Sequence, residues 1–189
     1  IVEKFIVGGV YRITLVDHKV AAVCMREAPN VVGDGINTIA ELIKIKNKHP
    51  WRGEAHQKNF TLHKITTDES AKAFLAKQGL DMESILPKGI KVYLRNKIIL
   101  KCGADIQDKT DEIHPDNIAL CQKISRLCET SLIGLDFICQ DISQPHHRQE
   151  CAVLEANSLP YIDMHHYPAT GKPRNVASLI MDYVLENFC

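Results

Sequence analysis

The residues best suited to chemistry lie at the end of one short apolar segment. Residues 152–157 read Ala-Val-Leu-Glu-Ala-Asn, and a proline follows at position 160. An apolar run closed by a proline predicts a short buried strand. Glu155 and Asn157 stand two residues apart, so a strand turns both side chains to the same face. A carboxylate and an amide oxygen side by side are ligands that Mg²⁺ prefers.

A third oxygen donor is available in the apolar segment at residues 133–139. Asp136 is the only charged residue in this segment, and a buried carboxylate needs a partner or a metal ion. If the two segments are neighbouring strands, Asp136, Glu155 and Asn157 form an acidic metal site. The alternative is that Glu155 only marks the end of a strand and that backbone donors satisfy Asp136.

The elements that position these residues can be read from the hydrophobic pattern. Residues 11–16 and 20–25 alternate about a short turn and predict a β-hairpin. Arg12 and Arg26 fall at its open end, where they could meet an anion. The alternative for each is a solvated charge at the end of a strand.

Four helices are expected in addition to these strands. Their capping residues and apolar spacing predict helices at about 38–47, 68–78, 115–129 and 173–187. Residues 52–66 are polar and irregular, and we expect a mobile segment there. The predicted fold class is α+β, a mostly antiparallel sheet with packed helices.

Composition excludes several classes of protein. The chain has 189 residues, with 23 Lys+Arg balancing 23 Asp+Glu. This balance argues against a nucleic-acid partner, and no apolar run reaches the roughly 20 residues of a membrane span. The seven cysteines are odd in number and scattered, which favours reduced thiols and a cytoplasmic location. A Cys139–Cys151 disulfide is the expected exception, if one forms.

The first residues also carry an expectation about the length of the protein. The chain begins with Ile1 and runs at once into the strand-like residues 2–6. We therefore expect a fragment, or the ordered part, of a longer chain.

Several motifs together resemble the ATP-grasp ligases. They are Val2-Glu3-Lys4-Phe5-Ile6, Tyr11-Arg12, residues 29–35 (PNVVGDG), Lys88-Gly89, Tyr93-Leu94-Arg95, residues 110–115 (TDEIHP), Gly134-Leu135-Asp136 and Glu155-Ala156-Asn157. The set is similar to cyanophycin synthetases and to the ligase half of bifunctional glutamate–cysteine ligase/glutathione synthetase. The motifs follow the order of that family over essentially the whole chain. The resemblance implies that residues 1–189 are a C-terminal ATP-grasp subdomain. A helical or irregular insertion is expected at about 30–90.

The resemblance also implies a reaction and its cofactors. ATP phosphorylates a carboxylate of an amino-acid or peptide substrate, and an amine attacks the acyl phosphate to form an amide. Mg²⁺, with Mn²⁺ as the alternative ion, would assist the phosphoryl transfer. The partner implied within the same chain is the N-terminal ATP-grasp subdomain, and without it we expect residues 1–189 to be inactive. Homo-oligomerisation stays open.

Site residues follow from the same resemblance, position by position. Asp136, Glu155 and Asn157 would bind the metal, and Glu3, Lys4, Phe5 and Ile6 would line the adenine site. Arg95 would hold the transferring phosphate, with Arg12 as a second catalytic arginine. Arg26, His165, Arg174 and Asn175 would contact the substrate.

Two departures from the family pattern favour a domain that has lost the ligase reaction. Val10 stands where the family usually has an acidic residue for the ribose hydroxyls. Residues 97–104 read KIILKCGA, where the branch usually has an Asn-x-Ser-Thr-Gly-Gly loop. A non-catalytic nucleotide-binding or regulatory domain is therefore the alternative to a ligase.

Overall fold

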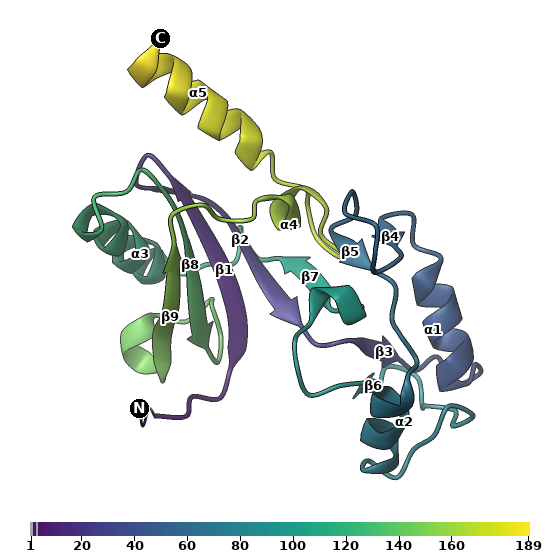
Figure 1. Ribbon diagram of the computed structural model, residues 1–189. Helices are drawn as coiled ribbons and strands as arrows, with labels where there is room; N and C mark the ends of the chain where they lie inside the picture. Colours follow the sequence, from purple (N-terminus) through teal and green to yellow (C-terminus); the bar gives the residue numbers. More distant parts are fainter. Residues whose placement is uncertain (1, 3) are drawn as a thin grey trace. The chain divides into compact units, whose positions relative to one another are not determined.

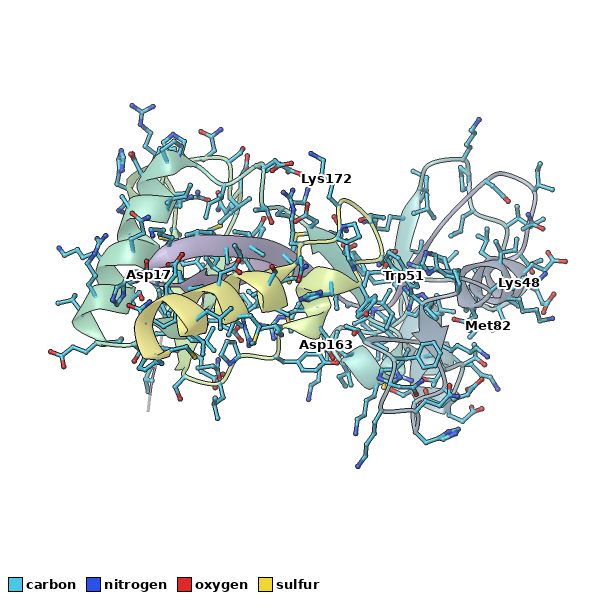
Figure 2. All side chains as sticks on the ribbon, turned by 90° about the horizontal axis from the view of Figure 1, so that it is seen from above. Asp17, Lys48, Trp51, Met82, Asp163 and Lys172 are labelled. Atoms are coloured by element: carbon cyan, nitrogen blue, oxygen red, sulfur yellow. The ribbon has the colours of Figure 1, made fainter. Side chains whose placement is uncertain are left out.

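The computed structural model describes residues 2 and 4–189 and divides the chain into two compact units (Figure 1). Unit 1 contains residues 1–26 and 106–189, and unit 2 contains residues 27–105. Figure 2 labels Asp17, Asp163 and Lys172 in unit 1, and Lys48, Trp51 and Met82 in unit 2. Each unit has its own hydrophobic core, so each is described separately.

Unit 1 is built on a five-stranded sheet in the order β7-β2-β1-β8-β9. Its strands are β1 (Gly9–Val16), β2 (Lys19–Glu27), β7 (Asp105–Asp108), β8 (Leu132–Cys139) and β9 (Cys151–Asn157). The pairs β1–β2, β1–β8 and β8–β9 are antiparallel. The predicted neighbourhood of the strands that carry Asp136 and Glu155 is therefore confirmed.

The β1–β2 hairpin turns at Asp17 and His18. Both residues have positive φ, 50° and 58°, which is the conformation that a tight two-residue hairpin turn requires. His18 Nδ1 lies 2.9 Å from Ser125 Oγ on α3 (Pro115–Leu127). The turn is thus attached to the helix that covers one side of the sheet.

One face of this sheet is apolar and packs against α3. Its buried side chains include Ile13, Leu135 and Phe137, together with Cys121 from the helix. These residues alternate along their strands with the polar residues of the other face, because successive strand residues point to opposite sides. The apolar core therefore fixes the register, and with it the face on which Arg12 and Asp136 lie.

The C-terminal part of unit 1 consists of η2 (His146–Arg148), α4 (Asp163–His166) and α5 (Val176–Phe188). Val176 on α5 packs against Val16 and Ala22 of the hairpin. Asn175 caps α5 by accepting a hydrogen bond from the Ser178 amide at 3.0 Å. Residues 173–175, expected inside this helix, precede it.

Unit 2 contains two small sheets and two helices. Strand β3 (Asn30–Val32) pairs antiparallel with β6 (Lys91–Tyr93), and β4 (Arg52–Gly53) pairs parallel with β5 (Leu62–His63). Helix α1 (Ile39–Asn47) begins after a capping box formed by Thr38 and Glu41, in which each residue satisfies a free backbone N–H group of the other. Helix α2 (Glu69–Ala76) begins after Asp68, whose side chain accepts from the Ala71 amide. A short helix, η1 (Leu100–Cys102), completes the unit.

The expectation of a mobile segment at residues 52–66 does not hold at its two ends, which are buried, whereas residues 54–60 are mostly exposed. Arg52, Leu62 and His63 are buried. Arg52 donates to the carbonyl oxygens of His63 and Gly103 and pairs with Asp105. A buried cation with three acceptors holds the segment in place, and the polar composition concealed this because arginine is usually exposed.

The cysteine prediction is confirmed, since all seven cysteines are free thiols. Cys139 and Cys151 are direct partners across β8 and β9, as expected for the pair most able to form a disulfide. No helix in the described part of the chain has the length and apolar character to cross a membrane.

Candidate active site

The centre of the candidate site is a row of side chains that crosses three strands. Arg12 on β1 is the direct partner of Asp136 on β8, and Asp136 is the direct partner of Glu155 on β9. Directly opposed residues present their side chains on the same face of a sheet. The sheet thus brings the two predicted acidic ligands together on the face opposite to α3.

Asp136 is held by two arginines. Its Oδ1 accepts from Arg12 Nε at 2.6 Å and its Oδ2 accepts from Arg26 Nη2 at 2.6 Å. Burial alone would raise the pKa of Asp136, but the hydrogen bonds and charges of Arg12 and Arg26 outweigh it and hold that pKa below its usual range. The alternative that backbone donors satisfy this carboxylate is therefore wrong.

The two arginines keep donors that no protein group uses. The terminal nitrogens of Arg12 have no hydrogen-bond partner among the described residues, although only 7% of the residue is exposed. The Nε atom of Arg26 is buried and also lacks a partner there. Unused guanidinium donors beside a satisfied carboxylate suit an incoming oxyanion.

Glu155 and Asn157 lie at the edge of the sheet. Glu155 is exposed and makes no ion pair within the described part of the chain. Asn157 is the partner of Gly134, to whose carbonyl oxygen its Nδ2 donates at 3.5 Å, leaving Oδ1 for another ligand. No cluster of three or more His, Cys, Asp or Glu side chains placed to hold a metal occurs in the described residues. A metal site here would depend on two carboxylates and one amide oxygen.

The absence of a side chain at Gly134 allows Pro160 and Arg12 to pack closely against β8. A Cβ atom at this position would lie 2.6 Å from Pro160 Cβ and 3.1 Å from Arg12 Cδ. A larger residue would therefore clash with Pro160 and press on the Arg12 side chain. The Gly-Leu-Asp sequence thus gives room for the arginine as well as the carboxylate.

A second row on the same face contains Thr14 and His165. Thr14 is the β1 partner of Gly134, and its Oγ1 lies 2.8 Å from Nε2 of His165 on α4. His165 is 2% exposed, and its Nδ1 atom has no partner among the described residues. Burial, with a smaller contribution from the charge of Arg12, lowers the pKa of His165 to about 4. The imidazole is therefore neutral at pH 7.

Arg174 and Asn175 have partners within the protein. Arg174 Nη2 lies 2.7 Å from Asp108 Oδ2 and 2.8 Å from an oxygen of Asp111. These two carboxylates raise the pKa of Arg174 above its ordinary value. Asn175 is the cap of α5. Their predicted contact with a substrate stays a prediction, and their observed contacts hold the segment between α4 and α5.

The predicted adenine-site residues lie before β1. Lys4 pairs with Glu150 at 2.5 Å, with both side chains largely exposed. Phe5 is 85% exposed and Ile6 is half-buried, and residues 4–6 have no regular secondary structure. Glu3 lies outside the described residues. The adenine assignment therefore stays a prediction.

Arg95 belongs to unit 2 and follows β6. Its Nη2 donates to Thr66 Oγ1 at 2.9 Å and to Asp68 Oδ2 at 2.6 Å. The carboxylate of Asp68 thus caps α2 and fixes Arg95 at the same time. The predicted phosphate contact of Arg95 stays a prediction.

The two departures from the family pattern, Val10 and residues 97–104, can be located in the structure. Val10 lies opposite Arg26 on β2 and shares the face of Arg12, two residues along the strand. In the 97–104 stretch, Ile98 and Ile99 are 38% and 40% exposed, and Gly103, the C-cap of η1, has a φ of 94°. A Cβ atom on Gly103 would lie 2.5 Å from Ile65 Cα, so this glycine is required by packing.

Thr14 and Asp108 are partners of predicted site residues, and the sequence reading missed both. Thr14 looks like an ordinary strand residue, and only the register places it under His165. Asp108 lies in a charged segment at the end of β7, and no spacing links it to Arg174, 66 residues away. Alternation along β1 could have placed Thr14 beside Arg12, but the partner of Asp108 could not have been found in this way.

Unit 1 therefore presents a sheet whose polar face carries an arginine-held aspartate, an exposed glutamate and an asparagine. The ligand roles of these residues stay predictions. The sequence motifs assign the chain, by resemblance, to the ATP-grasp ligases.

Comparisons with known proteins support this assignment. The chain is 41% identical over 187 residues to a cyanophycin synthetase of Trichormus variabilis, covering 99% of the chain and 20% of that protein. It is 33% identical over 182 residues to the glutathione biosynthesis bifunctional protein GshAB of Clostridium perfringens, covering 96% and 23%. No family model matches the chain.

A solved structure gives the same result for the fold. The crystal structure of a bifunctional glutathione synthetase from Pasteurella multocida matches with a TM-score of 0.87 at 34% identity. The match covers 96% of this chain and 25% of the other. The chain is thus homologous to a segment of these ATP-grasp ligases, and it spans about a fifth to a quarter of their length.

Proposed function

We propose that this chain is the metal-binding and phosphate-binding part of an ATP- and Mg²⁺-dependent carboxylate–amine ligase. The longer protein would activate a carboxylate of an amino-acid or peptide substrate as an acyl phosphate. An amine would then displace phosphate to form the amide. Seven free thiols suit a reducing compartment, so we propose the cytoplasm as its location.

The observation that carries this proposal is the row Arg12–Asp136–Glu155 with Asn157 beside it. Two short bonds fix Asp136, while the glutamate beside it on the edge strand is exposed. The site therefore combines hard oxygen donors with unused guanidinium donors on one face. Phosphoryl transfer requires this combination, because charge on the phosphate oxygens must be neutralised from more than one side.

The donor set fits a magnesium ion. Glu155 has no competing ion pair in the described part of the chain, Asn157 Oδ1 is available, and each oxygen of Asp136 keeps a second lone pair. Asp136, Glu155 and Asn157 would hold the ion, which when bound neutralises the nucleotide phosphates.

The remaining side chains supply orientation and charge. Arg12 and Arg26 hold Asp136 in one rotamer and would donate their unused N–H groups to an oxyanion. His165, neutral because its pKa is about 4, would act through hydrogen bonds and not through charge. Arg95 of unit 2 would bind an anion as well.

ADP release by the longer protein tests the proposal. The enzyme is incubated with ATP, Mg²⁺ and a panel of amino acids and short peptides, added singly and as carboxylate–amine pairs. A ligase releases ADP in proportion to amide formed, and only when both substrates are present. ADP release that never depends on an amine would overturn the proposal.

A non-catalytic nucleotide-binding domain is the second candidate. It is favoured by Val10 on the site face and by the apolar residues Ile98 and Ile99 in the altered loop. Metal-dependent nucleotide binding with no turnover for any pair in the same panel would support it.

A further inference from the structure

Thr14 is a fully buried hydroxyl residue on the polar face of the sheet in unit 1. It is 0% exposed, and its Oγ1 atom lies 2.8 Å from Nε2 of His165. Within the described part of the chain, this is the only hydrogen bond of the Thr14 hydroxyl group. The direction in which the hydroxyl proton points therefore depends on where the imidazole carries its own proton.

The His165 imidazole is held beside Thr14 by the backbone around it. The carbonyl oxygen of His165 accepts from the Arg174 amide at 2.8 Å. The next residue, His166, accepts through Nε2 from the Ala177 amide in the first turn of α5 at 3.2 Å. Helix α4 is thus tied to the segment that follows it, and the ring that it carries has little freedom to move away from β1.

A neutral imidazole carries its proton on one of two nitrogens, and the hydrogen bond made by one nitrogen selects which. If Nε2 of His165 is protonated, it donates to Thr14 Oγ1. The hydroxyl proton then has no acceptor, and Nδ1 has no donor, among the described residues. If Nδ1 is protonated, the hydroxyl group donates to Nε2, and only the Nδ1–H group is left without a partner. The second arrangement leaves one unsatisfied buried group in place of two, so its free energy is lower.

We propose that Thr14 is a positioning residue that fixes His165 in the Nδ1–H tautomer. The Nδ1–H group is then a free buried donor, and the ligand atom that satisfies it is an acceptor, an oxygen of an organic molecule. His165 in this tautomer is not a general base, because its free nitrogen is already protonated. The assignment of the acceptor to a substrate rests on the proposed ligase function, whereas the tautomer does not.

The tautomer can be measured on the 189-residue chain at pH 7, with no ligand added. Long-range ¹H–¹⁵N NMR correlations of the imidazole rings distinguish a protonated nitrogen from a bare one, and His165→Gln identifies the signals of this ring. A protonated Nδ1 and a bare Nε2 are expected. A protonated Nε2 would overturn the proposal, and this measurement needs no variant of Thr14.

Substitutions of Thr14 test whether its hydroxyl group selects the tautomer. Thr14→Val keeps the branched shape that suits a strand and removes the hydroxyl group, so the ring should become a mixture of both tautomers. Thr14→Ser keeps a hydroxyl group and should retain the pattern of the parent. Thermal unfolding tests that the variants are folded, and Thr14→Ala replaces Thr14→Val if the latter is not.

The matched control is Thr61→Val, which removes a buried hydroxyl group from unit 2. It should leave the His165 signals unchanged. A single unchanged tautomer in Thr14→Val, or the same change in the control, would overturn the role of Thr14.

The longer protein separates this role from the ligase reaction. Thr14→Val should raise the KM of the substrate that contacts Nδ1–H about three- to tenfold, with little change in kcat, and Thr14→Ser should stay close to the parent. An unchanged KM for every substrate would overturn the assignment of the acceptor to a substrate. If the chain shows the Nδ1–H tautomer and its dependence on Thr14 while the longer protein forms no amide, the role of Thr14 stands and the ligase function fails.

Discussion

Each unit of this protein contains one buried aspartate between two cations, and the two differ in what surrounds them. Asp136 in unit 1 pairs with Arg12 and Arg26, and Asp105 in unit 2 pairs with Arg52 and Lys46. Both aspartates are nearly inaccessible, with 7% and 6% exposure. Burial of a charged cluster alone therefore does not identify a functional site.

The cluster around Asp105 is closed. Arg52 also donates to the carbonyl oxygens of His63 and Gly103, and Lys46 also donates to both oxygens of Asn30. Asn30 in turn donates to Asp105 at 3.0 Å. Nearly every donor has an acceptor within the unit, so the cluster joins β3, α1, β4 and β7 and offers little to a ligand.

The cluster around Asp136 is open. Arg12 and Arg26 retain unused donors, and the row continues to the exposed carboxylate of Glu155. The comparison suggests that a closed cluster acts in stability and an open one in binding. The predictions below test that distinction.

The largest effect on stability is expected at the closed cluster. Asp105→Asn leaves Arg52 and Lys46 buried beside a neutral amide and should lower the free energy of unfolding by about 3–5 kcal/mol. Urea denaturation measures this, with the exposed Asp182→Asn on α5 as control, expected within about 0.5 kcal/mol of the parent. A loss below about 1 kcal/mol would show that the closed cluster does not stabilise the unit.

At the open cluster the main effect should fall on activity. In the longer protein, Glu155→Gln should reduce amide formation about 10²–10³-fold, equivalent to about 3–4 kcal/mol of transition-state stabilisation. Because Glu155 is exposed and unpaired in the described structure, urea denaturation should show nearly unchanged stability. Asp136→Asn should also impair activity, because it removes the negative charge that Arg12 and Arg26 hold in place. Full activity in Glu155→Gln would remove the metal site from the proposal.

His165 gives unit 1 a dependence on pH. Its pKa is about 4 in the folded protein, against about 6.5 for an unfolded histidine. The unfolded chain therefore binds a proton first as the pH falls, and stability is lost between about pH 6.5 and pH 4. The expected loss from this residue is about 3 kcal/mol. Urea denaturation across this range should show the loss in the parent and a smaller slope in His165→Gln; equal slopes would exclude His165 as the cause.

Much of the fold was predictable from local signals. Residues such as Thr38 and Asp68 mark helix starts directly, because a capping side chain acts on amides three residues away. The strand bearing Glu155 and the α+β class were likewise predicted by the apolar pattern. The expectation that this strand is buried is wrong, because β9 lies at the edge of the sheet and its residues 153–156 are exposed. Contacts between distant segments were not, because nothing in the sequence around Arg52 indicates that it is buried against Asp105, 53 residues away.

In the candidate site, too, local signals were predictable and contacts between distant segments were not. Alternation placed Glu155 and Asn157 on one face, and the lone charge of Asp136 indicated a buried partner. The identity of that partner depended on register, which set Arg12 opposite Asp136 and brought in Arg26. The sequence could not show that arginines, and not the neighbouring carboxylate, would determine the direction of the pKa shift at Asp136.

The smallest effect is expected at the rim of the closed cluster, where Lys91 pairs with Glu27 at 2.8 Å. The Lys91 side chain is 38% exposed, so water and salt screen the pair. Glu27 also accepts from Tyr93 Oη at 2.7 Å, and this bond would remain in Lys91→Met. We therefore expect a loss of no more than about 1 kcal/mol in urea denaturation, reduced further in 0.5 M salt. A loss close to that of Asp105→Asn would mean that the cluster responds as one unit out to its edge, and exposure would then be a poor guide to which of its ion pairs matter.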